Sequence, residues 1–233
     1  MKLCHMNVAW GAAGWHVEGN PTVEPSKEAP VLRRLVLPFA GLCLAAARIG
    51  AVHADDCPNA QTAKLGFVLE RQGIRAEIRP NADRFVHARN LYGGGRSQDV
   101  IYYGGLIEIS RFDDTARRIN IPMSDLRSVL PLDAKARRVL TYAPADPGRV
   151  GALVSLELTV TGQERVQLGA CDYAVLVVRN RSMAADGKVL SEYSDLFAPD
   201  LGFVLAKRYA ERAGGETTVS YKSIRPLSRT APL

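Results

Sequence analysis

The sequence is poor in the residues that most often carry metal or nucleophilic chemistry, with four cysteines and four histidines among its 233 residues. It also lacks any apolar run of the roughly 18 residues that a membrane-spanning helix needs, which excludes a multi-pass membrane protein. The net charge of +6 is modest and is not gathered into a basic stripe, so we expect no nucleic-acid partner. A hydrophobic content of 47% is instead typical of a globular protein.

Residues 31–54 have the layout of a secretory signal peptide. A pair of arginines precedes an apolar run at 35–47, and Val52 and Ala54 stand at the two positions that define a cleavage site. The run is too short to cross a bilayer. The alternative interpretation is a buried core helix, which Pro38 disfavours.

Cleavage near Ala54 divides the chain into two parts. Residues 1–54 are then a mis-annotated N-terminal extension followed by the leader, because thirty residues in front of such a leader suggest an over-long gene model. We expect residues 55–233 to form a single β-rich domain that is periplasmic or secreted.

In residues 55–233, hydrophobic residues recur at every second position wherever the pattern is regular. Apolar and charged residues alternate at 74–79, and apolar and polar residues alternate at 154–161, which indicates half-buried strands. Gly104 and Gly105 separate two β-rich segments, which is typical of a hairpin. We predict a mainly β fold: an antiparallel curved sheet, half-barrel or sandwich, with one short helix.

The expected helix covers residues 122–130, where apolar residues recur at helical spacing between two prolines. A helix of two to three turns is too short to cover a sheet of several strands. Because residues 173–178 are apolar on both faces, something else must cover them, and we predict an apolar pocket. Its predicted lining is Leu126, Leu156, Leu158, Leu176 and Phe203.

Metal and cofactor chemistry has little support in the exported part. His87 is its only histidine, which excludes a site with two histidine ligands, so we expect no metal. The glycine run at 93–95 leads into a strand and not a helix, which favours a flexible hairpin tip over a phosphate-binding loop. We therefore expect no cofactor.

Cys57 and Cys171 are the only cysteines after the expected cleavage site. In an oxidising compartment two such thiols favour a disulfide, which would tie the N-terminus to the strand that begins at Cys171. The alternative is a catalytic Cys171 beside Asp172, but a cysteine nucleophile usually needs a histidine partner.

The C-terminal residues 185–224 carry the most characteristic pattern. They read as a strand, a YSDLFAPDLG turn, a second strand, a Gly-Gly hairpin and a third strand. This order resembles the closing strands of secreted β-rich proteins of unknown function from Gram-negative bacteria and, more distantly, the half-barrels of periplasmic lipoprotein carriers. The carrier resemblance implies a cavity for an apolar ligand.

Three functions follow from these observations. The first is a non-enzymatic envelope binding or assembly module that offers an apolar sheet face to a lipid, another apolar ligand or an envelope protein. The second is an envelope enzyme that uses Cys171 or a carboxylate such as Asp172 or Glu108. The third is a structural β-domain whose arginines contact anionic envelope polymers.

Overall fold

The computed structural model describes residues 57–211 and 214–227. These residues form one antiparallel sheet of fourteen strands, so the predicted mainly β, antiparallel fold is confirmed. The expected leader and the residues before it lie outside the described residues. No helix in the described part of the chain has the length and hydrophobicity needed to cross a membrane.

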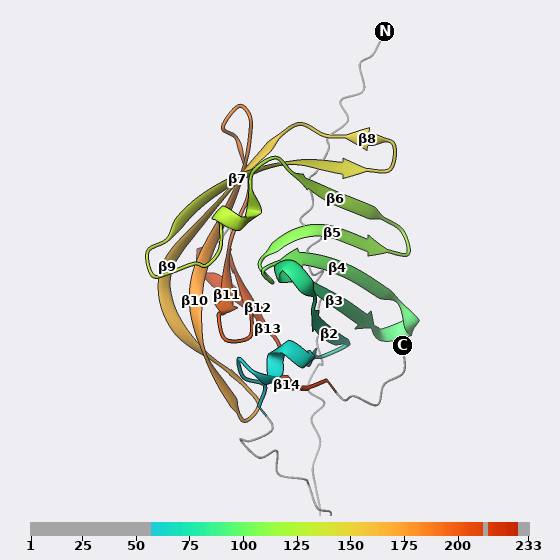
Figure 1. Cartoon of the computed structure of the whole chain (residues 1–233), viewed down its shortest axis with the longest axis vertical. Coiled ribbons are helices and arrows are strands. Elements are labelled where there is room, and N and C mark those ends of the chain that lie inside the picture. Colours follow the sequence, from blue (N-terminus) through green and yellow to red (C-terminus); the bar gives the residue numbers. More distant parts are fainter. Residues whose placement is uncertain (1–56, 212–213, 228–233) are drawn as a thin grey trace, which may run out of the picture. The chain divides into compact units, whose positions relative to one another are not determined.

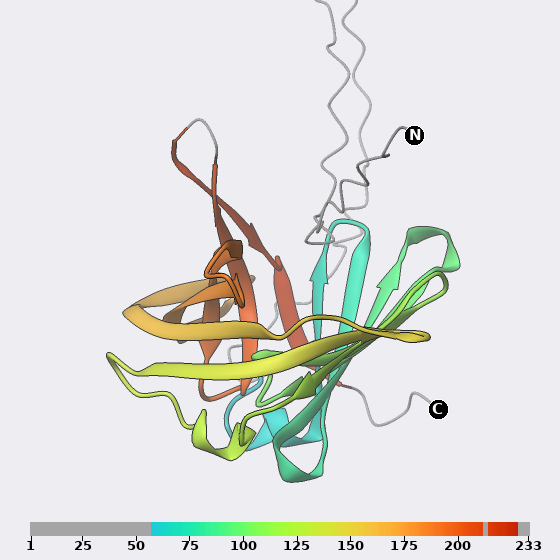
Figure 2. The ribbon, with the colours of Figure 1, turned by 90° about the horizontal axis from the view of Figure 1, so that it is seen from above.

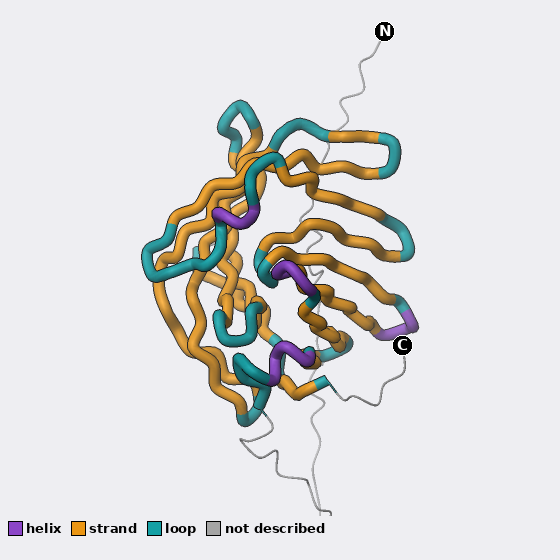
Figure 3. The backbone as a smooth tube through the Cα atoms, in the orientation of Figure 1, coloured by secondary structure: helices purple, strands orange, loops and turns teal. Residues whose placement is uncertain are grey.

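Figure 1 labels the strands, and Figure 3 shows how small the helical segments are beside them. The strands are β1 (Phe67–Arg71), β2 (Ile74–Pro80), β3 (Phe85–Tyr92), β4 (Ser97–Tyr103), β5 (Ile107–Asp113), β6 (Arg117–Pro122), β7 (Arg137–Asp146), β8 (Arg149–Val150), β9 (Val154–Leu168), β10 (Cys171–Ala184), β11 (Val189–Ala198), β12 (Phe203–Ala210), β13 (Glu216–Ser220) and β14 (Ser223–Pro226). The helical segments are the 3₁₀ turns η2 (Thr62–Leu65), η3 (Ala82–Arg84), η4 (Gly93–Gly95) and η5 (Leu126–Ser128).

The sheet is a meander. Its two edge strands, β13 and β14, follow each other directly in the sequence. Its order is β13-β12-β11-β10-β9-β7-β6-β5-β4-β3-β2-β1-β14, with the short β8 paired to β7. Only Tyr221 and Lys222 separate β13 from β14 in the sequence. The segment therefore pairs with β12 through its first half and with β1 through its second half, and Figure 2 shows it between the two arms of the curved sheet.

Hydrogen bonds at the junction of β13 and β14 reach both arms. The backbone N–H of Lys222 donates to the carbonyl of Glu70 at 2.7 Å, and that of Tyr221 donates to the carbonyl of Leu205 at 3.5 Å. Ser223 lies opposite Glu70 in the register that follows. The C-terminal segment thus links the first strand of the sheet to the last strands.

Two apolar clusters fill the space that the curved sheet encloses. The first contains Phe67, Ile78 and Phe203, and the second contains Leu140 and Leu158. Strand β10 contributes to both, because Val175 packs in the first cluster, and Leu176 and Val178 pack in the second. This explains the apolar character of both faces of β10.

A single 3₁₀ turn, η5, stands where the sequence predicts a helix of two to three turns. Strand β6 extends to Pro122, so the segment leaves the sheet only there. The helically spaced residues are used for packing: Val129 is buried, and Leu126 and Leu130 are half-buried against the second cluster. The short helix of the predicted fold is therefore replaced by a loop.

The predicted Gly104-Gly105 hairpin joins β4 to β5. Both glycines have positive φ, which other residues rarely adopt. A Cβ atom on Gly105 would also overlap the carbonyl of Gly202, at the turn between β11 and β12. This hairpin therefore needs glycine both for its turn and for its contact with the C-terminal strands.

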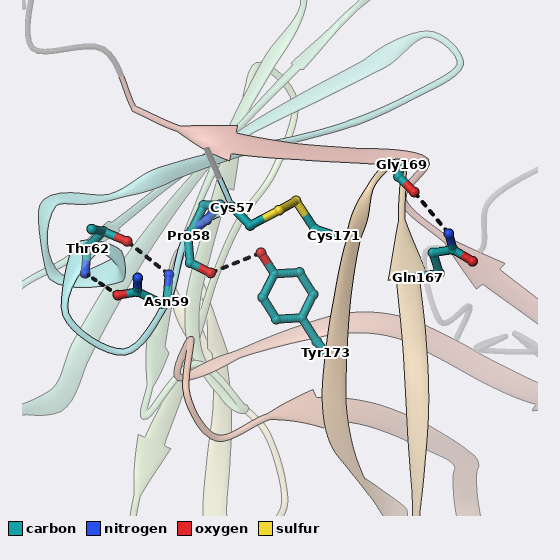
Figure 4. The surroundings of a disulfide bond; sticks show 8 residues. All are labelled: Cys57, Pro58, Asn59, Thr62, Gln167, Gly169, Cys171 and Tyr173. Atoms are coloured by element: carbon teal, nitrogen blue, oxygen red, sulfur yellow. Dashed lines mark hydrogen bonds between the residues drawn. A yellow bond between two sulfur atoms is a disulfide. The ribbon is translucent and has the colours of Figure 1, made fainter. Parts of the chain in front are cut away.

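The predicted disulfide between Cys57 and Cys171 is present and joins residues 114 positions apart (Figure 4). Beside it, the buried Tyr173 hydroxyl donates a hydrogen bond to the carbonyl of Pro58 at 3.0 Å. The first described residues are thereby fixed to the start of β10, as expected.

We predict that Cys171→Ala lowers the free energy of unfolding by about 2 to 4 kcal/mol, because the bond closes a long loop of the unfolded chain. Chemical denaturation with and without reductant measures the difference. The Cys57→Ala variant and the double variant should be no less stable than Cys171→Ala, since each removes the same bond. Equal stability of the wild type and Cys171→Ala would show that the disulfide is not a constraint on the fold.

Candidate functional site

Polar side chains share one face of β10, β11 and β12, among strands that are otherwise apolar. Asp195 of β11 lies opposite Lys207 of β12, and Tyr193 lies opposite Asn180 of β10. Two residues along β12 from Lys207, the ring of Tyr209 lies 5.9 Å from the ring of Tyr193. Alternation along each strand places these five side chains on the same face.

A buried ion pair is the centre of this group. The Lys207 Nζ lies 2.6 Å from Oδ1 of Asp195 and 4.6 Å from the centre of the Tyr193 ring. The Asn180 amide donates to the other Asp195 oxygen at 3.0 Å and to the carbonyl of Val178 at 2.9 Å. The Asp195 side chain is 1% exposed and that of Lys207 is 31% exposed, so the carboxylate is sealed while the lysine keeps contact with solvent.

Burial acts on both members of this pair. Burial raises the pKa of the Asp195 carboxyl, against the opposing effect of Lys207 and Asn180. Burial lowers the pKa of the Lys207 ammonium, but the charge of Asp195 and the nearby Tyr193 raise it more, so that it stands well above its usual value. Lys207 is therefore a permanent cation at physiological pH.

A second polar group lies on β3, β4 and β5. Tyr102 of β4 is opposite Glu108 of β5 in the register. The Arg111 guanidinium donates hydrogen bonds to both carboxylate oxygens of Glu108. Nearby, the Tyr92 hydroxyl donates to Oε1 of Gln98 at 3.3 Å.

The strands of the two groups are in contact, because the ring of Tyr102 on β4 packs edge-on against the ring of Phe203 on β12, with 5.5 Å between the ring centroids. The charge of Lys207 acts on the pKa of Tyr102 and Tyr221, and the charge of Arg71 at the end of β1 acts on the pKa of Tyr209. We call the combined set the polar cluster: Arg71, Tyr92, Tyr102, Glu108, Arg111, Asn180, Tyr193, Asp195, Lys207, Tyr209 and Tyr221.

Four tyrosine hydroxyls of the polar cluster have no protein partner among the described residues. Burial raises the pKa of Tyr102 and Tyr209, and raises that of Tyr221 to about 12. For Tyr193 the charge of Lys207 lowers the pKa, but burial and the nearby carboxylates bring it to about 12. All four remain protonated at neutral pH, and none of their oxygens is sealed from solvent without a partner.

Four of the five residues of the predicted apolar pocket come together in or against the second apolar cluster, and the fifth lies in the first. Leu158 and Leu176 are buried in the second apolar cluster, against which Leu126 and Leu156 pack, and Phe203 belongs to the first. Leu176 also lines an open hollow of about 390 Å³ on the β9–β10 hairpin, which none of the other four borders. A pocket lined by these residues stays a prediction.

The residues of the enzyme hypothesis lie apart from one another. Cys171 is bonded to Cys57 and so carries no free thiol. Asp172 accepts a hydrogen bond from Arg165 at 2.7 Å on an exposed part of the β9–β10 hairpin. His87 is half-buried and lies 2.6 Å from Asp99, while Glu108 belongs to the polar cluster.

A signal for the polar cluster exists in the sequence but is weak. Asp195 and Lys207 interrupt the apolar strands YSDLF and GFVLAKRY, within the segment whose strand, turn, strand and hairpin order is confirmed. The sequence pattern explains that segment as a structural turn. Nothing in it shows that Tyr102 and Arg71, about a hundred residues earlier, lie across from these charges.

The fold and the site define a mainly β protein whose curved sheet carries polar groups in its interior. Among solved structures, the chain is similar to the hypothetical lipoprotein YmcC from Escherichia coli, with 12% identity and a TM-score of 0.44 over 77% of this chain and 92% of that one. That similarity is too low to inform function. No family model and no curated protein matches the chain.

The raised tyrosine pKa values predict alkaline instability. A tyrosine whose pKa rises on folding stabilises the folded state below its usual pKa of 10, and this contribution is lost as the pH rises through the raised value near 12. We therefore expect the free energy of unfolding to fall between pH 10 and pH 12. Denaturation at a series of pH values, with phenolate absorbance recorded in parallel, measures this loss.

The Tyr221→Phe variant should lose less stability over the same pH interval, because it lacks one of these ionising groups. An equal decrease in the wild type and the variant would show that Tyr221 titrates normally in the folded protein.

Proposed function

We propose that this protein is an exported, non-enzymatic binding module and that its ligand contacts the polar cluster. The observation that carries this proposal is the buried ion pair of Asp195 and Lys207 beside tyrosine hydroxyls that have no protein partner among the described residues. The tyrosine oxygens are not sealed from solvent, so a ligand can reach them beside the ion pair.

Stability alone does not account for the ion pair. Removing two charges from water costs several kcal/mol per ion, and apolar residues of similar size often give an equally or more stable protein. The same sheet encloses two apolar clusters that meet no such cost. A charged pair retained in this setting therefore supports a functional role, and perturbed ionisable groups are enriched at such sites.

Two observations support export. A disulfide forms and persists mainly outside the cytoplasm, and the Cys57–Cys171 bond is present. The bond also uses the thiol of Cys171, which removes the nucleophile from one form of the enzyme hypothesis and leaves only its carboxylates. The expected leader at 31–54 agrees with the same compartment.

Retention of a natural ligand tests the proposal without knowledge of its identity. We expect the protein purified from bacterial periplasm to carry an added small-molecule mass in native mass spectrometry. This mass should disappear after unfolding, dialysis and refolding. In hydroxyl-radical footprinting, Tyr193, Tyr209 and Tyr221 should then become more reactive, while the buried Tyr103 and Tyr173 should not change.

The Asp195→Leu/Lys207→Met double variant is the matched control. We expect it to fold with a stability equal to or up to about 4 kcal/mol above that of the wild type, and to carry no added mass. If the wild type has no added mass and its footprint is the same before and after refolding, the proposal is wrong.

A further inference from the structure

The second half of β9 has a neighbouring strand on only one side. β9 pairs with β10 along its whole length, but its pairing with β7 stops at Thr159. One further hydrogen bond follows, from the N–H of Val160 to the carbonyl of Ala136 at 2.8 Å. Beyond it, residues 162–168 pair with β10 alone among the described strands. We call residues 162–168 the open edge.

The turn of the β9–β10 hairpin determines which backbone groups of the open edge face outward. Residues 169 and 170 form a two-residue turn, with positive φ at Gly169, and Leu168 lies opposite Cys171. Such a turn makes this closing pair a hydrogen-bonded one. Hydrogen-bonded pairs then alternate along an antiparallel ladder. The backbone N–H and C=O groups that point away from β10 are therefore those of the exposed residues Gln163, Arg165 and Gln167.

The charged side chains of the open edge are already paired within the protein. Glu164 accepts two hydrogen bonds from Arg208, at 2.7 and 3.1 Å, and Arg165 donates one to Asp172 at 2.7 Å. Unpaired charges on an edge strand discourage the addition of a new strand. Because each of these charges has a partner, the open edge is suited to an uncharged segment.

An open hollow of about 390 Å³ lies on β9 and β10 beside the open edge. Gln163 is opposite Leu176 and Arg165 is opposite Ala174, so these side chains share one face, and Pro199 also lines the hollow. The residues that β10 and the β11–β12 turn contribute to the lining are apolar. A strand added at the open edge would lie about 4.8 Å from β9, from where a long apolar side chain reaches the hollow.

We propose that the open edge binds an extended segment of another protein, which adds as a strand beside β9 and places an apolar side chain in the hollow. An extended polypeptide repeats its backbone donors and acceptors at the spacing of the outward groups on β9. In this mode of recognition the main-chain hydrogen bonds provide affinity, and pockets for alternate side chains provide specificity. The open edge contains no residue of the polar cluster, so this interaction is additional to the proposed function.

A second copy of this chain fits the open edge less well. Two identical edges that pair antiparallel are related by a two-fold axis. Full overlap of residues 162–168 with the same residues of a copy centres on Arg165 and places that side chain opposite itself. Like charges directly opposite each other destabilise a sheet. The open edge therefore favours a segment of a different sequence.

Amide hydrogen exchange followed by NMR tests the proposal, with the synthetic peptide Lys-Thr-Val-Thr-Leu-Thr-Val-Thr-Lys as the probe. In the free protein we expect the amides of Gln163, Arg165 and Gln167 to exchange faster than those of Glu164 and Val166. With the peptide at about ten times its dissociation constant, exchange at the three outward amides should slow about tenfold. The same peptide with every backbone N–H methylated keeps its side chains but cannot pair, and should have no effect.

The Arg165→Pro variant removes an outward N–H in the middle of the open edge without taking a donor from the β10 ladder. We expect it to fold and to weaken peptide binding about tenfold or more, because the hydrogen bonds at this position are lost. The matched control Arg165→Gln removes the guanidinium but keeps the N–H, and should bind the peptide like the wild type. The methylated peptide makes the same test on the unchanged protein.

The hollow is tested separately with Ala174→Phe, which fills it. In the wild type, replacing the central leucine of the peptide by alanine should weaken binding about tenfold, because an apolar side chain loses its contact. In Ala174→Phe the leucine and alanine peptides should bind equally. A preference for leucine that survives in this variant would show that the hollow does not receive the side chain.

Two results would overturn the binding of a peptide strand. One is unchanged exchange at Gln163, Arg165 and Gln167 with the peptide, or equal protection by its methylated form. The other is protection of these amides that appears without peptide and rises with protein concentration, since it would assign the open edge to a second copy.

Discussion

The double pairing of the C-terminal segment is the constraint on which the rest of the structure depends. Glu216–Ser220 pairs with β12, and Ser223–Pro226 pairs with β1, so a segment of eleven residues links the two ends of the sheet. A curved sheet encloses an interior only if its two edges are held near each other. The first apolar cluster depends on that arrangement, because it contains residues of both β1 and β12.

The enclosed space contains both apolar clusters and charged groups. The apolar clusters contain residues from nearly every strand, and burial of each large apolar side chain contributes about 1.5 to 3 kcal/mol. The polar cluster lies beside the junction of β13 and β14, where Tyr221 is half-buried next to the end of β1. A tyrosine of the polar cluster therefore lies where the sheet is joined.

Local patterns in the sequence predict the strands and turns well. Alternation at 74–79 marks β2, Gly104-Gly105 marks the β4–β5 hairpin, and the two cysteines mark the disulfide. The predicted helix at 122–130 is absent because its spaced apolar residues pack from a loop against the second cluster. Helical spacing alone does not distinguish these two uses of the same residues.

The candidate site could not be predicted in the same way, because its contacts join distant parts of the chain. Asp195 and Lys207 interrupt apolar strands, but their significance depends on Tyr102, Glu108 and Arg71 lying opposite. That arrangement arises only when β14 pairs with β1. A sequence pattern that extends over ten residues contains no information about this closure.

Amide hydrogen exchange in a chain that ends at Tyr221 tests this dependence most directly, since the truncation removes β14 and keeps β13. We expect protection to be lost in β1 and also in β12, because the two ends of the sheet are no longer joined. Loss of protection confined to β1, with β12 and β13 protected as in the complete chain, would contradict it.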